Sequence, residues 1–374
     1  MKKSYYSLGL MSGTSMDGVD ASIIRSDGKS KYKAILDNYF EYPKNIYKNL
    51  TKLRDKISNS RDLKKYRKQI KFVEKEITIF HAKVVIQILK KTKLSVDFIG
   101  FHGQTIFHNA EEQITKQLGD GKLLSKLTKK TVVYDFRQND LKNRGQGAPL
   151  TPVFHKLLAK KLNLKTVTFL NIGGITNETS ILEGDYVTAT DLGPGMCLID
   201  EWIRNNSKKK YDDKGKIAMK GKINNSILEK AYIHTHKLAY MNKINKNLNK
   251  TTFDIKDFNL YYFDQLSLKD GAATITELTF KTFLRSFWVS NPKIRTILCG
   301  GGRKNDFLVK KLKNYKKLYV KLIDDYGIDG DFVESQAFAY LAVRSYLKLP
   351  ISFPTTTGVR KPCTGGVIIK SRFK

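Results

Sequence analysis

The chain has 374 residues, of which 41% are hydrophobic and 11% aromatic, a length and composition typical of a folded protein with more than one hydrophobic core. Three widely separated cysteines exclude a disulfide framework and a cysteine metal cluster, and no apolar run reaches the roughly 20 residues that span a bilayer. The formal net charge of +33 permits nucleic-acid binding, but lysines recur in almost every segment, which favours a general composition bias.

The first half of the chain begins with a predicted β-hairpin, in which apolar residues 5–11 and 19–24 flank a turn of Ser, Gly, Thr and Asp. Serines interrupt the N-terminal apolar stretch and no small-residue cleavage site follows, so we interpret it as a buried strand rather than a signal peptide. Residues 44–93 are highly charged with apolar positions at helical spacing, which predicts two or three helices. Further strands are predicted at 96–101 and 131–136.

The second half repeats this alternation. Strands are predicted at 166–172, 179–182, 186–190 and 294–299, and helices at 152–162, 197–250, 270–288 and 332–347. Alternating strands and helices in both halves predict two α/β domains with a cleft between them. We place these domains at residues 1–140 and 141–354, and the tail 355–374 is a segment that can return to the first domain.

The hairpin turn is the first candidate phosphate site. It reads Gly13-Thr14-Ser15-Met16-Asp17-Gly18-Val19-Asp20. Its backbone N–H groups and hydroxyls suit phosphate oxygens, and its two carboxylates suit Mg²⁺ or sugar hydroxyls. An ordinary hairpin turn also favours Gly, Ser and Asp, so the motif alone leaves both interpretations open.

Two glycine-rich turns follow predicted buried strands in the second half. Asn171 precedes the pair Gly173 and Gly174, and three glycines at 300–302 are followed by Asn305. Glycines at a strand end let the backbone approach a ligand closely, and the triple glycine suits a nucleotide lying flat against it. The glycine pair equally suits a two-residue hairpin.

Two carboxylates stand near predicted helix starts. Asp191 ends a predicted strand just before Gly193-Pro194-Gly195, where a carboxylate in a cleft can accept a proton from water or a hydroxyl. The alternative is that Asp191 caps the following helix. Glu334 lies in the first turn of the last predicted helix, where an isolated carboxylate acts as a cap.

Two polar clusters complete the candidates in the first half. The segment His102-Gly103-Gln104-Thr105 is predicted to end a strand, and Asp135-Phe136-Arg137 precedes the turn Gly145-Gln146-Gly147-Ala148-Pro149. Taken singly, the first is equally a polar loop and the second a capped helix entrance.

The ordered set of motifs resembles the anhydro-N-acetylmuramic acid kinase family. The motifs are Ser-Gly-Thr-Ser-x-Asp-Gly-x-Asp, His-Gly-Gln-Thr, Asp-Phe-Arg, Gly-Gln-Gly-Ala-Pro-Leu, Asn-Ile-Gly-Gly-Ile-x-Asn, Asp-x-Gly-Pro-Gly, Cys-Gly-Gly-Gly-x-x-Asn and Glu-x-x-Ala-Phe-Ala. The resemblance covers nearly the whole chain. It implies a two-lobed actin-like ATPase fold of the α/β class, with ribonuclease-H-like sheets and a central cleft.

The resemblance also implies the reaction. Water opens 1,6-anhydro-N-acetylmuramic acid at the anomeric carbon, and the freed 6-oxygen takes the γ-phosphoryl group of ATP with the help of Mg²⁺. The product is N-acetylmuramic acid 6-phosphate, formed during recycling of cell-wall peptidoglycan. The family further suggests a homodimer in the cytoplasm that binds a small sugar and ATP, with no membrane or specific nucleic acid as partner.

Site roles carried over from the family fall on four groups of residues. ATP is assigned to Gly13, Thr14, Ser15, Met16, Asp17, Gly18, Val19, Asp20, Gly173, Gly174, Gly300, Gly301, Gly302 and Asn305. The sugar is assigned to Gln104, Arg137, Gly147, Ala148, Pro149 and Asn171. Asp191 is assigned as the general base, and Glu334 as a residue that supports the metal.

The chain departs from the family beside the assigned base, where Leu192 and Met196 replace the more usual Thr and Asn. The loss of a hydroxyl and an amide leaves a second reading open, in which a kinase of the same fold phosphorylates a different sugar. A third reading is a binding protein of this fold that uses its positive charge to hold nucleic acid.

Overall fold

The computed structural model describes residues 4–245, 253–284 and 293–371. Within them the chain forms two compact units, which are described separately. Unit 1 comprises residues 1–160 and 332–374, and unit 2 comprises residues 161–331. Among the described helices, none is both long enough and apolar enough to cross a membrane.

Unit 1 is built on a mixed sheet in which antiparallel and parallel strands meet at β1. The strands are β1 (Tyr5–Ser12), β2 (Gly18–Ser26), β3 (Tyr32–Glu41), β4 (Phe98–Asn109), β5 (Ile114–Leu118), β6 (Thr131–Tyr134) and β12 (Val367–Ile369). Their order is β12-β6-β4-β1-β2-β3, with β5 paired to β4. The first three strands are antiparallel, whereas β4 pairs parallel to β1 and β6 parallel to β4.

Helices cover this sheet and complete two apolar cores. They are α1 (Lys44–Lys56), α2 (Ser60–Lys65), α3 (Arg67–Lys90), α4 (Gly121–Thr128), α5 (Gln138–Lys142), α6 (Pro152–Lys161), α11 (Val333–Tyr346) and α12 (Pro354–Thr357). One core joins side chains of α1, α3 and α4 to the sheet. A second core includes Phe338 and Leu341 of α11 together with Phe98 of β4 and Val133 of β6.

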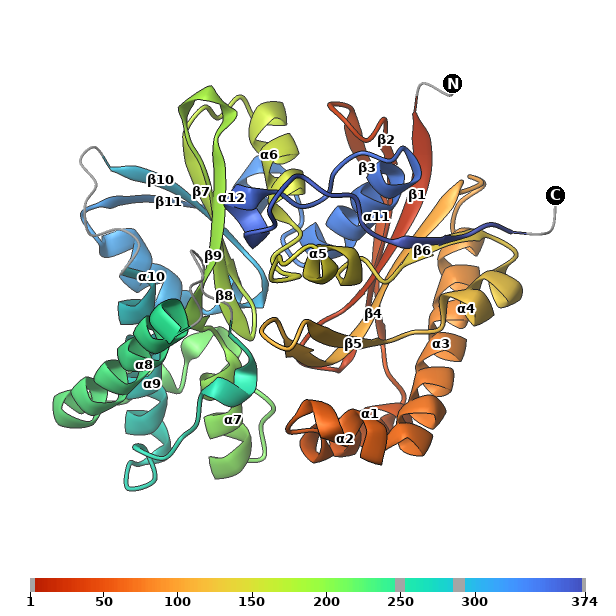
Figure 1. Ribbon diagram of the computed structural model, residues 1–374. Coiled ribbons are helices and arrows are strands. Elements are labelled where there is room, and N and C mark those ends of the chain that lie inside the picture. Colours follow the sequence, from red (N-terminus) through yellow and green to blue (C-terminus); the bar gives the residue numbers. More distant parts are fainter. Residues whose placement is uncertain (1–3, 246–252, 285–292, 372–374) are drawn as a thin grey trace. The chain divides into compact units, whose positions relative to one another are not determined.

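The late helix α11 lies directly on the strands at the start of the chain, as Figure 1 shows for the blue helix among the red strands. A Cβ at Gly9 would come within 1.9 Å of the Ser335 carbonyl oxygen, and one at Gly100 within 2.3 Å of the Phe338 carbonyl oxygen. These two glycines are partners across β1 and β4. Side chains at either position would push the helix off the sheet, so the glycines allow close backbone packing.

The strands of unit 2 repeat the order β6-β4-β1-β2-β3 of unit 1, without counterparts of β12 and β5. They are β7 (Val167–Ile172), β8 (Ile175–Ile181), β9 (Val187–Pro194), β10 (Ile294–Cys299) and β11 (Leu318–Leu322), in the order β11-β10-β7-β8-β9. Strands β7, β8 and β9 are antiparallel, and β10 and β11 join β7 in parallel. The same order and directions appear in both units, which is the ribonuclease-H-like arrangement that the resemblance implies.

The helices of unit 2 pack around the sheet in two apolar clusters. They are α7 (Cys197–Asn206), α8 (Asn225–Asn245), α9 (Leu268–Leu284) and α10 (Asp306–Asn314). Phe283 of α9 and Leu308 of α10 pack on Leu170 and Leu298 of the sheet, while Trp202 of α7 belongs to the cluster with α8 and α9. The α/β class expected from the sequence is confirmed.

The boundaries between the two units differ from residues 140 and 354, which the sequence analysis had indicated. Unit 1 continues through residue 160 and takes the chain back at residue 332. The reason is packing: α11 covers the sheet of unit 1, and β12 pairs antiparallel with β6. The return to the first unit therefore begins with α11 rather than with the tail 355–374.

Several elements differ from the sequence prediction. Strand β4 continues to Asn109 because its second half pairs with β5, so the predicted strand end at residues 102–105 is wrong. Strand β9 extends through Pro194, which places Asp191 inside a strand rather than at its end. The sequence prediction also missed β3, β5, β11 and β12. The parts of the predicted helices at 246–250 and 285–288 lie outside the described residues.

Candidate functional site

The β1–β2 turn of unit 1 is held by Ser12 at the end of β1 and by side chains from two other places in the chain. The Ser12 hydroxyl lies 2.6 Å from Oε1 of Gln104 and 2.9 Å from the Gly18 carbonyl oxygen, and it accepts a hydrogen bond of 3.0 Å from the Tyr42 hydroxyl. The Gln104 amide nitrogen donates to the Gly13 carbonyl at 2.9 Å. Gln104, which the resemblance assigns to the sugar, therefore lies against the predicted phosphate turn.

The eight residues of this turn divide by exposure. Met16 and Val19 point into the apolar core, so only their backbone groups can face a ligand. Thr14, Ser15 and Asp17 are exposed, and the Ser15 hydroxyl donates to Asp17 at 2.5 Å. Hydroxyls and backbone N–H groups at the tip of the turn are the donors that phosphate oxygens require.

A second polar group in unit 1 joins β4 to the segment after β6. His102 is buried, its Nδ1 lies 2.8 Å from the Gly103 carbonyl, and its Nε2 lies 2.9 Å from Nη2 of Arg137. Nη1 of Arg137 donates to the Gly147 carbonyl at 2.8 Å. Since a carbonyl only accepts and a guanidinium only donates, the His102 ring is neutral with its proton on Nδ1. Burial, and then the charge of Arg137, hold the pKa of His102 well below its usual value.

Four side chains form a row across the sheet of unit 2. Register pairs Cys299 of β10 with Asn171 of β7, Asn171 with Asn177 of β8, and Asn177 with Asp191 of β9. Residues directly opposite each other on neighbouring strands project from the same face, with Cβ atoms about 5 Å apart. The row thus places two amides and a carboxylate side by side.

Within this row Asp191 and Asn177 differ in their contacts. One oxygen of the Asp191 carboxylate, Oδ2, accepts a hydrogen bond of 3.0 Å from the Phe253 backbone N–H. The amide oxygen of Asn177 is buried and has no hydrogen-bond partner in the part of the chain that the structure describes. A buried acceptor next to a carboxylate is suited to a ligand hydroxyl or a water. The sequence motif contains Asn177, but the pairing that brings it beside Asp191 depends on register.

The alternative in which Asp191 caps a helix is wrong. The helix after β9 is α7, whose cap position is Met196. Asp191 is five residues earlier and its side chain contacts the Phe253 backbone instead.

Gly173 and Gly174 form the two-residue turn between β7 and β8, and backbone groups hold it. The Met196 N–H donates to the Gly173 carbonyl at 2.8 Å, and the Gly195 and Cys197 N–H groups donate to the Gly174 carbonyl at 2.9 and 3.2 Å. A Cβ on Gly195 would lie 2.3 Å from the Gly173 carbonyl oxygen, so this contact requires glycine.

The triple glycine of unit 2 follows β10 and packs on the Asn171 row. Gly300 has a φ of +75°, and a Cβ there would lie 2.5 Å from Oδ1 of Asn171. A Cβ on Gly301 would meet no atom within 4 Å, so this residue presents open backbone. Asn305, assigned to ATP by resemblance, is the N-cap of α10, and its Oδ1 accepts from the Leu308 N–H at 3.0 Å.

Arg303 links this glycine turn to two nearby carboxylates. Its buried guanidinium donates to Asp324 and Asp331, each at 2.7 Å, and to the Gly300 carbonyl at 3.1 Å. The hydrogen bond from Arg303 lowers the pKa of Asp324 below its usual value. For Asp331, burial acts in the opposite direction, but hydrogen bonds from Arg303 and Lys304 still lower its pKa. The sequence indicated the glycines but not this ion-pair cluster.

Glu334 lies in the first turn of α11, as expected, and the next residue contacts β1 at Gly9. Among the described residues, no three His, Cys, Asp or Glu side chains cluster as metal ligands. A Mg²⁺ ion bound with a nucleotide needs only one or two protein carboxylates, because phosphate oxygens and waters supply the rest. A single carboxylate such as Glu334 or Asp17 fits that requirement.

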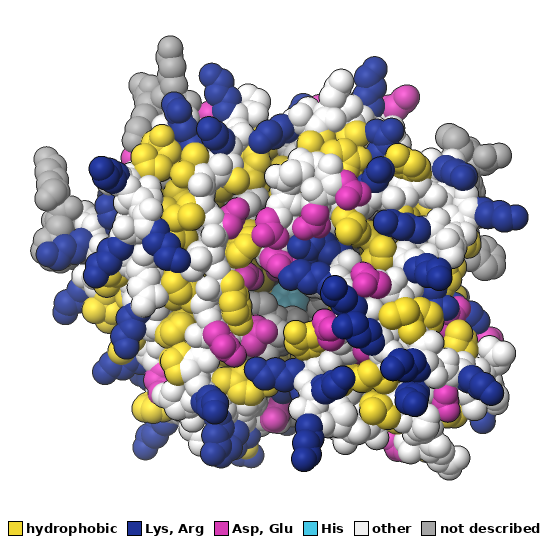
Figure 2. Space-filling view, turned by 180° about the vertical axis from the view of Figure 1, so that it is seen from behind, with side chains coloured by type: hydrophobic (Ala, Val, Ile, Leu, Met, Phe, Trp, Pro, Cys, Tyr) yellow, Lys and Arg dark blue, Asp and Glu magenta, His cyan; other side chains and the backbone are white. Residues whose placement is uncertain are grey.

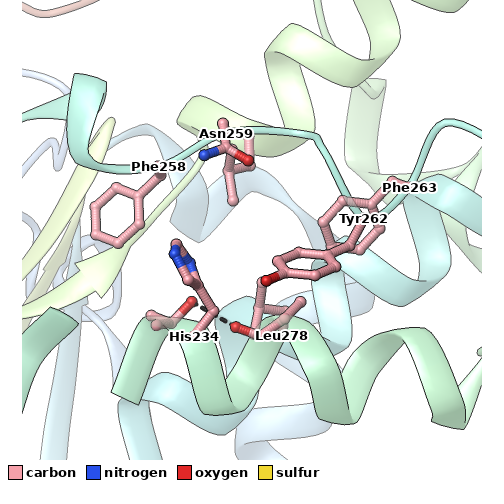
Figure 3. A pocket seen from close by; sticks show the side chains of 9 residues that line it. His234, Phe258, Asn259, Tyr262, Phe263 and Leu278 are labelled. Carbon is pink, nitrogen blue, oxygen red and sulfur yellow. Dashed lines mark hydrogen bonds between the residues drawn. The ribbon is translucent and has the colours of Figure 1, made fainter. Parts of the chain in front are cut away.

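His234 and His236 of α8 stand apart from these groups. Figure 3 shows His234 on the wall of a small pocket formed with Phe258, Asn259 and Tyr262, where its ring lies 5.8 Å from that of Tyr262. No residue that the sequence assigns to ATP, sugar or metal lines this pocket. Aromatic packing therefore accounts for the position of His234.

On the face shown in Figure 2, the positive charge is distributed rather than gathered. Figure 2 shows lysine and arginine side chains over the whole of the displayed face, with acidic side chains between them. Nucleic-acid binding proteins concentrate such charge on a stripe or patch. The distribution on this face favours the composition bias over the nucleic-acid reading.

Comparison with known proteins identifies the family. The family model described as anhydro-N-acetylmuramic acid kinase matches residues 5–371. A protein of that name from Pelagibacter ubique is 51% identical, over 99% of this chain and 100% of its own length. One from Agrobacterium fabrum is 37% identical, over 97% and 98%, and one from Rhizobium johnstonii is 37% identical, over 96% and 97%.

The chain belongs to the anhydro-N-acetylmuramic acid kinase family. It is therefore a sugar kinase, as the ordered motifs predict, and the reading as a nucleic-acid binding relic has no support from the comparisons. In this member of the family, Leu192 faces away from the Asn171 row, because neighbouring residues of a strand project from opposite faces of the sheet. Leu192 packs in the core with Leu170 and Phe283, and Met196 packs against the same core. Burial thus explains the apolar side chain of Leu192, whereas Met196 is half-buried against two apolar clusters.

Proposed function

We propose that this kinase opens 1,6-anhydro-N-acetylmuramic acid with water and phosphorylates its 6-oxygen from ATP, giving N-acetylmuramic acid 6-phosphate during peptidoglycan recycling in the cytoplasm. The observation that carries the proposal is the position of Asp191, a carboxylate in a row with Asn171 and Asn177 on one face of the sheet. A carboxylate next to polar groups that can hold a water or a hydroxyl is the arrangement that general base catalysis needs.

In the proposed reaction, Asp191 accepts a proton from water while the water oxygen bonds to the anomeric carbon. The bond between that carbon and the 6-oxygen breaks, and the 6-oxygen attacks the γ-phosphorus of ATP. The bond between the γ-phosphorus and the oxygen that links it to the β-phosphate of ATP breaks, and ADP leaves. The product thus gains one water and one phosphoryl group over the substrate.

ATP is assigned to the glycine turns of both units. The Gly13–Asp20 turn would hold the phosphates through backbone N–H groups and the Thr14 and Ser15 hydroxyls, while residues 300–302 would lie against adenosine. Mg²⁺, held by Glu334 or Asp17 together with the phosphates, would neutralise charge that develops in phosphoryl transfer. The protein otherwise contributes by positioning the reacting groups.

The sugar is assigned to Arg137 and residues 147–149 of unit 1 and to Asn171 of unit 2. Arg137 is oriented by His102 and by the Gly147 carbonyl, so its planar cation is held in one place. A fixed guanidinium suits the carboxylate of a muramic acid better than a neutral hexose. This argument favours the anhydro-sugar over the alternative of a different sugar.

The test is incubation of the purified protein with ATP and the anhydro-sugar, followed by mass spectrometry. The expected product is heavier than the substrate by one water and one phosphoryl group. Turnover of an ordinary hexose without turnover of the anhydro-sugar would contradict the proposal and favour the alternative. Omission of Mg²⁺ from the assay tests whether the reaction needs the metal. Light scattering tests whether the protein is a homodimer.

A further inference from the structure

The loop formed by residues 145–149 is held by a segment more than 200 residues later in the sequence. Three consecutive N–H groups of the loop are fixed. The Gly145 N–H donates to the Asp140 carbonyl at 2.9 Å, the Gln146 N–H to the Thr357 carbonyl at 2.8 Å, and the Gly147 N–H to Oδ1 of Asp140 at 2.6 Å. The loop therefore has two anchors, one on α5 and one on α12.

These two anchors are joined to each other by a buried hydrogen bond. The Thr357 hydroxyl donates to Oδ2 of Asp140 at 2.6 Å. Asp140 is 1% exposed and Thr357 is fully buried. Away from water, a hydrogen bond that a carboxylate accepts is stronger than one between neutral groups, and losing one partner is costly. Asp140, Thr357 and the loop thus form one connected unit, and α5 and α12 lie near each other in Figure 1.

The packing leaves the loop little room to move. A Cβ on Gly145 would lie 2.1 Å from Oδ1 of Asp140, and one on Gly147 would lie 3.0 Å from Leu141. The Gly147 carbonyl accepts from Arg137. The peptide group on each side of Gly147 is therefore set by a side chain, Asp140 before it and Arg137 after it.

We propose that Asp140 and Thr357 are positioning residues for the sugar, and that they act by holding the 145–149 loop and, through Gly147, the orientation of Arg137. The inference rests on the proposed role of that loop in sugar binding. Neither side chain needs to touch the sugar. It follows that the segment 353–357, which carries none of the recognised motifs, belongs to the supporting structure of the sugar site.

The decisive variant is Thr357→Val, which removes the hydroxyl and keeps the shape. We expect KM for the anhydro-sugar to rise by about tenfold, while KM for ATP and kcat change by less than about twofold. Thr357→Ser restores the hydroxyl and should restore the sugar KM. Thr356→Val is the matched control, because the Thr356 hydroxyl bonds only within its own turn, to the backbone of Phe353.

A measurement without substrate separates this inference from the proposed reaction. In Thr357→Val, amide hydrogen exchange at residues 145–147 should become about tenfold faster than in the wild type, with no such change in Thr356→Val. Unchanged exchange overturns the anchoring, whichever sugar the enzyme phosphorylates. Faster exchange with an unchanged sugar KM overturns the positioning role.

Asp140→Asn covers the case in which Thr357→Val does not fold. The amide keeps the size of the side chain but removes its charge, so the hydrogen bond with the Thr357 hydroxyl is no longer accepted by a carboxylate and is weaker. The same selective rise in the sugar KM is expected. Equal rises in KM for sugar and ATP would show a general loss of structure and overturn the proposal.

Discussion

The first hairpin of each unit joins equivalent strands of the same sheet order, but different groups hold the two turns. In unit 1, the β1–β2 turn is fixed by the side chains of Ser12, Gln104 and Tyr42. In unit 2, the β7–β8 turn is fixed by backbone N–H groups of residues 195–197. A side-chain network can be altered one residue at a time, whereas a backbone contact depends on the absence of a side chain at Gly195.

The units also differ in their histidines. His81, His102 and His155 of unit 1 are buried, and burial lowers the pKa of His81 to about 4 and that of His155 to about 3. His234 and His236 of unit 2 lie on α8 beside tyrosine rings. Two units with the same core strand order thus differ in what holds their candidate site residues. Buried side chains hold them in unit 1, and backbone contacts and strand register hold them in unit 2.

Acidification should give the largest difference between the units. An unfolded histidine has a pKa near about 6.5, so below that pH the unfolded chain binds protons that His81, His102 and His155 do not. The contribution of these neutral histidines to the free energy of unfolding is fully present above a pH of about 6.5. It is lost as the pH falls toward 4, by up to about 1.4 kcal/mol per histidine and pH unit. Hydrogen exchange measured against pH should show unit 1 opening first. Opening of unit 2 at the higher pH would contradict this expectation.

Asp191→Asn should have the largest effect on catalysis. The amide keeps an acceptor for the Phe253 N–H but cannot take a proton from water, so kcat should fall by about a thousandfold while ATP still binds. Product formation and nucleotide binding are measured separately. Asp213→Asn, which removes a charge at an exposed ion pair with Lys216, is the control. Near-normal turnover of the Asp191 variant would exclude it as the base.

Gly195→Ala should break the backbone-held hairpin. The added methyl would lie 2.3 Å from the Gly173 carbonyl, so the backbone must shift, and we expect a loss of about 2 kcal/mol in the free energy of unfolding. Gly13→Ala in the other hairpin is the matched substitution, because a Cβ there meets no atom within 4 Å. Urea denaturation compares the two. Equal losses would remove the contrast between the turns.

Gln104→Leu should have the smallest effect of these substitutions, and it tests whether Gln104 supports ATP binding or sugar binding. Loss of its bonds to Ser12 and Gly13 loosens the β1–β2 turn, so KM for ATP should rise about fivefold. Steady-state kinetics with each substrate varied in turn decides the matter. A rise confined to the sugar KM would instead support the assignment of Gln104 to the sugar.

Much of this organisation follows from sequence pattern. Alternating apolar residues and turn glycines predicted β1, β2, β7 and the α/β class, because local periodicity reports which face of a strand is buried. Strands β3 and β11 were missed, since most of their residues are half-buried or exposed and the alternation is weak. Their place in the sheets depends on pairing with distant strands.

The candidate site shows the same limit. Glycine turns and Asp191 stand out as motifs, but the row that joins Asp191 to Asn177 and Asn171 arises from strand register. The contact between Thr357 and Asp140 joins residues 217 positions apart. Arg303, which follows β10, likewise contacts Asp324 and Asp331, which follow β11, and β10 and β11 pair in parallel. Such contacts depend on tertiary structure, which no single segment encodes.

The placement of α11 on Gly9 and Gly100 has a consequence for how the chain is made. Unit 2 is one continuous stretch, whereas the first strands of unit 1 must wait for a helix encoded after the whole of unit 2. On a ribosome, which releases the N-terminal part first, the later unit can complete its core before the earlier one. Until α11 emerges, the face of β1 and β4 that carries Gly9 and Gly100 lacks the helix that covers it, and we expect the nascent chain to be open to chaperones and to aggregation during this interval.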